Sequence, residues 1–168
     1  HLPLSEPPDD RRSFLRADGG APRPFHLAIA VHDLEAAEDF YTHVLGAGIG
    51  RRSERWIDFD LGGHQITAHL VPRTGSGRGE APDSGSNPVD GDSVPIPHFG
   101  LVLTMEAWER LADSLHRKAC EFLVPPRVRF RGQRGEQGTL FLRDPSGNAL
   151  EFKGFRTAAS LFDDAGAY

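Results

Sequence analysis

Apolar and polar positions follow two different periods in the first half of the chain. Residues 25–31 are almost continuously apolar, which is typical of a buried strand. Residues 33–45 instead place apolar side chains three and four positions apart behind Asp33, which can cap a helix, and two glycines end this pattern. Three short strands are then expected, near residues 49–53, 55–61 and 64–71.

The same succession of patterns returns in the second half. Residues 98–103 predict a strand, and Thr104 can cap a helix with apolar side chains on one face. Further strands are expected near residues 121–124, 127–131, 138–143 and 148–154. The sequence therefore predicts an α+β fold of two tandem βαβββ modules, whose curled mixed sheet surrounds a cavity.

Segments rich in Pro, Gly, Ser and Asp separate these two predicted units from each other and from the chain ends. Such segments bury too little apolar surface to fold alone. The predicted organisation is a flexible N-terminal arm (1–23), a first βαβββ module (24–72), a linker loop (73–94), a second βαβββ module (95–156) and a C-terminal tail (157–168).

Composition and charge narrow the expected partners. The net charge of −5 and the pI of about 5.9 give no positive field for a phosphate backbone, so nucleic-acid binding is not expected. No apolar run approaches the roughly 18 residues of a membrane span. The one cysteine, Cys120, allows no intrachain disulfide and no cysteine-based zinc site. These features predict a cytoplasmic protein.

Two histidines and one glutamate occupy matched positions in the repeat. His26 and His98 begin the first strand of each unit, and Glu151 lies in an apolar stretch of the last strand. A carboxylate inside a strand is costly unless it is paired or bound to a metal. Two His and one carboxylate suit Fe(II) and other first-row divalent metals. A single strand histidine is more often structural, but the symmetry of the repeat favours a shared metal.

The motifs around these residues resemble a known family. They are the segment 26–34 with Phe40-Tyr41, and the segment 144–152, which reads Asp-Pro-Ser-Gly-Asn-Ala-Leu-Glu-Phe. Both resemble the vicinal oxygen chelate superfamily, which contains glyoxalase I, extradiol dioxygenases, bleomycin-type resistance proteins and fosfomycin resistance enzymes. The resemblance implies one divalent metal that chelates two neighbouring substrate oxygens, and it implies a homodimer. The family's metal ligands correspond to His26, His98 and Glu151.

Further site residues follow from comparing the two units. Thr67 aligns with Glu151, and His69 lies two residues later on the same strand face. We expect His69 to carry a proton in catalysis, and a local bulge would instead make it a fourth ligand. Extradiol dioxygenases usually place Tyr ten residues before the Glu ligand, where this chain has Phe141. That difference weakens an assignment to catechol cleavage. Thr67 and Phe141 are predicted to contact the substrate.

An arginine-rich segment follows the second predicted helix. Arg127, Arg129 and Arg131 alternate and so share one strand face, and Glu136 lies in the glycine-rich turn beyond them. Arginine clamps carboxylates and phosphates through paired hydrogen bonds. One hypothesis is a lid in which Arg129, Arg131 and Glu136 bind an anionic substrate. The alternative is a solvated edge strand whose charges prevent association.

We therefore expect a metal-dependent enzyme. An Fe(II)-dependent dioxygenase is favoured over a glyoxalase-type isomerase or lyase, for which Ni or Zn would be the metal, and Mn is a further candidate for the site. The expected substrate is a small oxygen-chelating molecule, either a vicinal diol or a keto acid. The second hypothesis is a non-catalytic resistance protein that binds a drug or metabolite. The complete His, His, Glu set argues against that hypothesis, because such binding proteins often lack the ligands.

Overall fold

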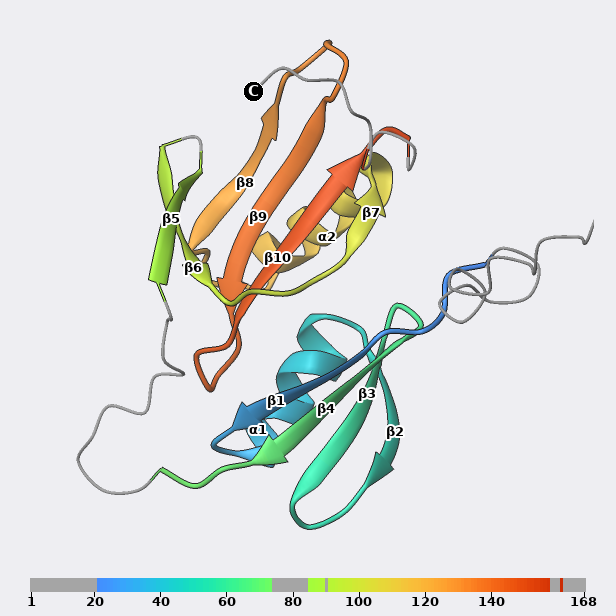
Figure 1. Cartoon of the computed structure of the whole chain (residues 1–168), viewed down its shortest axis with the longest axis vertical. Coiled ribbons are helices and arrows are strands. Elements are labelled where there is room, and N and C mark those ends of the chain that lie inside the picture. The colour runs from blue at the N-terminus through green and yellow to red at the C-terminus, as the bar shows by residue number, and fades with distance from the viewer. Residues whose placement is uncertain (1–20, 74–84, 90, 158–160, 162–168) are drawn as a thin grey trace, which may run out of the picture.

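The computed structural model describes residues 21–73, 85–89, 91–157 and 161, which form two βαβββ modules and a hairpin (Figure 1). The first module contains β1 (His26–Val31), α1 (Leu34–Asp39), a π-helical turn (Phe40–Val44), β2 (Gly48–Arg52), β3 (Trp56–Leu61) and β4 (His64–Leu70). The hairpin contains β5 (Gly85–Val89) and β6 (Asp92–Ile96). The second module contains β7 (Val102–Thr104), α2 (Met105–Arg117), β8 (Val124–Arg129), β9 (Gln137–Arg143) and β10 (Ala149–Phe155). The predicted α+β fold of tandem modules is confirmed.

The two modules share one sheet topology. The strand orders are β1-β4-β3-β2 and β7-β10-β9-β8, with one parallel pair in each sheet. Leu27 pairs with Ile66 in the first sheet, and Phe99 pairs with Leu150 in the second. The offsets are 99 − 27 = 72 and 150 − 66 = 84, which are the offsets at which the two halves of the sequence align. The internal repeat is therefore also a repeat of backbone pairing.

Each sheet packs one face against a helix and leaves the other face, here called the open face, without one. Because side chains alternate along a strand, the two faces carry different residues. Apolar side chains on the helix side form the core, among them Ile57, Phe59, Ile66, Leu140, Leu142, Leu150 and Phe152. The open face of the first sheet carries His26, Ala28, Asp58, Gln65, Thr67 and His69, and that of the second carries Thr139, Phe141, Glu151 and Lys153.

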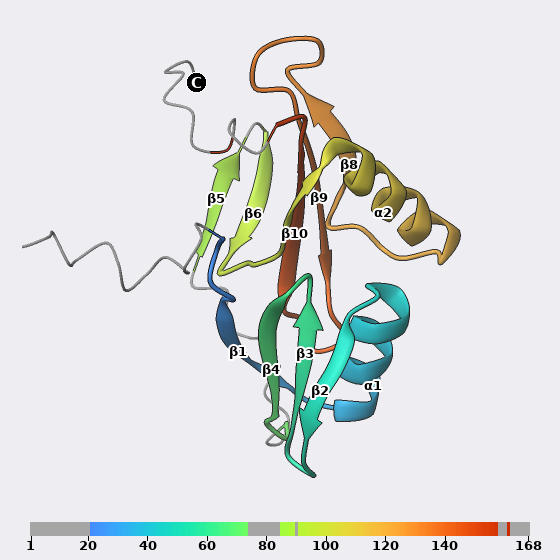
Figure 2. The ribbon, with the colours of Figure 1, turned by 90° about the vertical axis from the view of Figure 1, so that its right-hand side faces the viewer.

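The modules lie end to end along the long axis of the molecule (Figure 1). Figure 2 shows both helices on one side of the sheets, so the two open faces look towards the other side. The β5–β6 hairpin lies on that other side of the second sheet (Figure 2), where its Val94 packs against Val124 and Phe141. The strands of the two modules thus form two separate hydrogen-bonded sheets.

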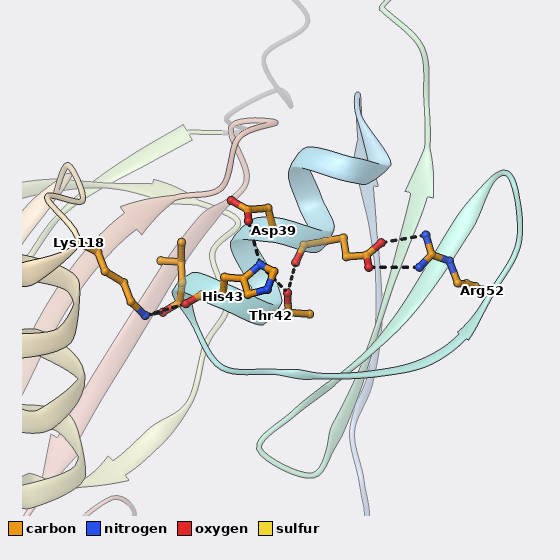
Figure 3. Close-up of polar contacts among 7 residues, drawn as sticks. Asp39, Thr42, His43, Arg52 and Lys118 are labelled. Carbon is orange, nitrogen blue, oxygen red and sulfur yellow. Dashed lines mark hydrogen bonds and ion pairs between the residues drawn. The ribbon is translucent and has the colours of Figure 1, made fainter.

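A few hydrogen bonds join the two modules. Asp144 is buried and accepts the hydroxyl of Tyr41 at 2.9 Å, and the Asn148 amide donates to the Ala30 carbonyl at 2.9 Å. Burial and the neighbouring Asp144 carboxylate raise the pKa of Tyr41 above its ordinary value, so its hydroxyl stays a donor. Lys118, beyond the end of α2, donates to two carbonyls at the end of the π-helical turn (Figure 3).

The surface of α1 and the π-helical turn is held by local ion pairs (Figure 3). His43 contacts Asp39 through Nδ1 at 2.9 Å, and Arg52 of β2 pairs with Glu38 at 2.8 Å. The His43 side chain is exposed. His43 is therefore a solvated residue of the helix surface. Asp33 caps α1 through the Ala36 backbone N–H, as the sequence predicts.

Two predictions about the second half of the chain were wrong. The strands expected at 121–124 and 127–131 are the single strand β8, which has a register shift between Val124 and Arg127. The two prolines at the shift donate no backbone hydrogen bond, so regular pairing is interrupted there. Residues 85–94, expected in the linker loop, instead form most of the β5–β6 hairpin, in which Val94 packs on an apolar surface and Asp92 pairs with Arg127.

The strand expected to be buried, β1, is buried only at its end. Val31 is inaccessible to solvent, whereas His26, Ala28 and Ala30 are exposed on the open face. The predicted arm and tail, and the linker before β5, lie mostly outside the described residues. Among the described residues, no helix has the length and apolar character needed to cross a membrane.

Candidate metal-binding site

The second module brings two predicted metal ligands together on its open face. The segment before β7 runs beside β10, where the Glu151 N–H donates to the Phe99 carbonyl at 2.8 Å. This pairing sets Nε2 of His98 at 3.1 Å from Oε2 of Glu151. Thr139 of β9 donates its hydroxyl to the other Glu151 oxygen at 3.0 Å. Only 13% of the Glu151 side chain is exposed, so its charge is held in a largely dehydrated position.

The hydrogen bonds of His98 prepare its outer nitrogen to bind a cation. Nδ1 lies 2.7 Å from the backbone carbonyl of Pro95, which only accepts hydrogen bonds, so Nδ1 carries a hydrogen. In the neutral ring Nε2 therefore has a lone pair directed at the carboxylate of Glu151. Two electron-rich groups face each other at 3.1 Å, and a proton or a metal ion between them would stabilise both. The pair fits a divalent metal.

His26, the third predicted ligand, lies on the other module. It is exposed at the start of β1, where its Nδ1 lies 2.9 Å from Oε1 of Gln65. Within the part of the chain that the structure describes, no three His, Cys, Asp or Glu side chains lie close enough to share one ion. A single chain therefore assembles two of the three predicted ligands.

Thr67 and His69 share the open face of the first sheet with His26. Thr67 donates its hydroxyl to Asp58 at 2.6 Å. His69 pairs with Ala30, four residues along the strands from the pairing of His26 with Gln65. Four residues of strand span roughly 13 Å, which is too far for His26 and His69 to bind the same ion. The register of the strands therefore argues against His69 as a fourth ligand.

Phe141 lies beside His98, and its ring meets the imidazole edge-on at a centroid distance of 5.0 Å. Arg129 pairs with Gln137 on the open face of the second sheet, and Arg131 is exposed in the loop after β8. Glu136 is different, because its carboxylate is already bound. The backbone N–H of Gly132 and the guanidinium of Arg156 reach it at 2.5 and 2.6 Å. Glu136 therefore joins the loop to Arg156, and its contact with a substrate stays a prediction.

The environment of Glu136 predicts how this loop responds to acid. The Gly132 N–H, and then Arg156, lower the pKa of the Glu136 carboxyl below its ordinary value of 4.5. The resulting stabilisation is complete above that value and is lost as the pH falls through the lowered pKa. We expect the Glu136→Gln variant to unfold at lower urea than the wild type at about pH 7, with the difference shrinking as the pH falls below about 4.5. Glu121→Gln, at an exposed position, is the control for charge alone. A difference that grows in acid would contradict this account.

Three residues of the site were not found from the sequence. Lys153 reaches within 4.0 Å of Glu151, and the period-2 alternation of β10 already placed both on one face. Thr139 could not be identified as a site residue, because threonine is common in strands. The Pro95 carbonyl is a backbone group, so no residue type marks it.

Two cavities bear on the position of the site. One of about 250 Å³ adjoins His98 and is lined mainly by backbone and apolar groups, namely Leu27–Ala30, Pro97–Phe99 and Gly147–Ala149. A larger cavity of about 630 Å³ lies against α1 at the ion pairs of Figure 3. Only the first touches a predicted ligand. This cavity lies where residues of the two modules meet.

The fold and this residue pair together define a class: proteins of paired βαβββ modules with a histidine–glutamate pair on the open face of the second sheet. Residues 23–152 match the model of the Glyoxalase/Bleomycin resistance protein/Dioxygenase superfamily. The chain belongs to this superfamily, and the resemblance seen in the sequence is confirmed.

Solved structures agree with this assignment. A glyoxalase/bleomycin resistance protein/dioxygenase from Alicyclobacillus acidocaldarius is 32% identical, covering 87% of this chain and 96% of that chain, with a TM-score of 0.60. A lactoylglutathione lyase from Agrobacterium tumefaciens is 18% identical over 80% of this chain and 94% of that one, with a TM-score of 0.55. A fosfomycin resistance protein from Listeria monocytogenes is 16% identical over 83% and 98%, with a TM-score of 0.57. The last two show a shared fold. The comparison with curated proteins gave no match.

Proposed function

We propose that this protein is a metal-dependent enzyme whose ion is held by His98 and Glu151 of one chain and by His26 of a second copy. The observation that carries the proposal is the approach of His98 Nε2 to Glu151 Oε2, 3.1 Å, with Nδ1 of the ring already used by the Pro95 carbonyl. His26 has its Nδ1 held in the same way, by Gln65. Both rings thus offer Nε2, the nitrogen that a shared ion requires.

The arrangement of the modules supports a homodimer. Both open faces look to the same side, and the sheets lie end to end (Figures 1 and 2). A twofold axis between two such chains sets the first sheet of each against the second sheet of the other, and it creates two identical sites. The same contact would cover Val102, which pairs with the open-face Lys153 and is 45% exposed in a single chain.

We favour an Fe(II)-dependent dioxygenase acting on a small oxygen-chelating substrate, such as a vicinal diol or keto acid. Two imidazoles and a carboxylate leave coordination positions open, and a metal there supplies Lewis-acid and oxygen chemistry. Lys153 and Arg129 of the open face would orient an anionic group of the substrate, and Phe141 would exclude water beside His98. His69 would exchange a proton at the end of the substrate away from the metal. A reducing cytoplasm suits both Fe(II) and the free Cys120.

A glyoxalase-type isomerase or lyase that uses Ni, Zn or Mn is the second candidate. One neighbour in structure is a lactoylglutathione lyase, and another is a fosfomycin resistance protein. The same ligand pair and the same Lys153 would serve a substrate with an anionic group next to the reacting oxygens. The two candidates differ in metal identity and in the need for dioxygen.

Metal analysis of protein purified without chelators tests the proposal. We expect about one divalent ion per chain in the wild type, and none in Glu151→Ala, because the carboxylate supplies the negative charge of the site. Glu121→Ala, at an exposed position, is the matched control. Oxygen uptake with vicinal diols and keto acids then separates a dioxygenase from an isomerase or lyase. Unchanged metal content in Glu151→Ala would overturn the site.

A further inference from the structure

We propose that Asp58 and Gln65 are positioning residues that fix the tautomer of His26. They hold the ring with its hydrogen on Nδ1 and leave Nε2 free to bind a cation. The importance of this for metal binding rests on the proposed function, whereas the state of the ring itself follows from the hydrogen bonds alone. Neither Asp58 nor Gln65 is among the metal ligands proposed above.

The side chain of Asp58 determines how Gln65 is oriented. It is a carboxylate on the open face of the first sheet, and only 6% of the residue is exposed. Its Oδ1 accepts the Thr67 hydroxyl at 2.6 Å, and its Oδ2 accepts the amide of Gln65 at 3.1 Å. The Nε of Arg51 lies 3.5 Å from Oδ2. An ionised carboxylate only accepts hydrogen bonds, so Gln65 must turn its NH₂ group towards Asp58.

The orientation of Gln65 then determines the state of His26. With its NH₂ group on Asp58, Gln65 presents Oε1 to Nδ1 of His26 at 2.9 Å. A carbonyl oxygen accepts and does not donate, so Nδ1 of His26 carries the hydrogen. The neutral imidazole has one hydrogen, which leaves the lone pair on Nε2. Asp58 therefore acts on His26 through Gln65 without touching the ring.

The repeat explains why the first module uses such a chain of bonds. Thr67 aligns with Glu151, since 151 − 84 = 67, and the strand partner of Thr67 is Asp58, while that of Glu151 is Phe141. The carboxylate of the first module is thus shifted by one strand from the ligand position. In the second module the glutamate faces His98 directly. In the first module the displaced Asp58 orients the ring of His26 instead.

The test compares Asp58→Asn with Asp60→Asn in the full chain. Asp60 lies two residues away on the same strand and face, and its carboxylate accepts the Gly63 N–H at 2.7 Å. The two variants lose the same charge, but only Asp58→Asn frees Gln65 to turn over. Gln65→Met is the second variant, since it removes the amide and keeps a similar length.

Nitrogen-15 NMR of the metal-free protein reads the tautomer of His26, whose signals are assigned by their absence in His26→Gln. We expect the Nδ1–H form in the wild type and in Asp60→Asn. In Asp58→Asn and Gln65→Met we expect a mixture containing the Nε2–H form. Calorimetric titration with Co²⁺ or Zn²⁺ should show affinity lowered about 10–100-fold in Asp58→Asn and unchanged in Asp60→Asn.

Two results would overturn the inference. One is a wild-type His26 that already carries its hydrogen on Nε2, and the other is an Asp58→Asn variant with unchanged tautomer and unchanged affinity. If the wild type has the expected tautomer but binds no divalent metal, the proposed function fails and the positioning of His26 by Asp58 is supported. The two failures are therefore distinguishable.

Discussion

A mixture of His26→Ala and Glu151→Ala protein is expected to regain divalent-metal binding that neither variant has alone. In the proposed dimer one site takes His26 from one chain and the His98–Glu151 pair from the other. A mixed dimer of the two variants then has one complete site and one site that lacks two ligands. After random exchange of chains about half of the dimers are mixed, so the expected metal content is roughly a quarter of the wild-type value.

The control for this experiment is a mixture of His98→Ala with Glu151→Ala. Both residues belong to the same half of the site and lie 3.1 Å apart within one chain, so no mixed dimer contains a complete site. Chains with two different affinity tags show that exchange has occurred. If exchange occurs and the His26→Ala mixture still binds no metal, His26 does not act across the dimer. Equal restoration in both mixtures would contradict the ligand assignment.

The repeat could be predicted from the sequence, because equivalent positions of the two modules form equivalent backbone pairs and carry side chains of the same type. Leu27–Ile66 and Phe99–Leu150 are equivalent pairs, and each is apolar because it faces a helix. Glu151 could be singled out because its neighbours in the strand are apolar, and the symmetry of the repeat and the family motif pointed to the same residue. Both helix caps, Asp33 and Thr104, were also found, since an N-cap is a local signal.

The relative placement of the modules could not be predicted from these patterns. It depends on a few long-range bonds, such as Tyr41 to Asp144 and Lys118 to the π-helical turn, and no periodicity encodes them. For this reason the sequence predicted one site within a chain, whereas His26 lies on a different sheet from Glu151. The hairpin that orients His98 was missed for a related reason. Its stability comes from Val94 packing on the second sheet and not from its own composition.

Gly100→Ala is expected to destabilise the second module strongly and to abolish the His98–Glu151 pair. A Cβ at position 100 would lie 1.6 Å from the backbone oxygen of Glu151 and 2.7 Å from its carbonyl carbon. No rotation of a side chain relieves this contact, because both atoms belong to the main chain of β10. The strands would have to separate, with loss of the bond from the Glu151 N–H to Phe99. We expect the free energy of unfolding to fall by more than about 3 kcal/mol.

Urea denaturation and metal titration together check this prediction. Gly48→Ala is the matched control, because its new Cβ would meet Asp60 at 3.5 Å, an ordinary van der Waals distance. The aligned position of the first module, 100 − 72 = 28, carries Ala28 without disturbing the pairing of β1 with β4. Glycine is therefore required only where the segment around Gly100 contacts β10 closely. The same backbone contact sets the distance between His98 and Glu151. A Gly100→Ala protein that kept wild-type stability and metal affinity would show that this backbone contact does not hold the ligand pair in place.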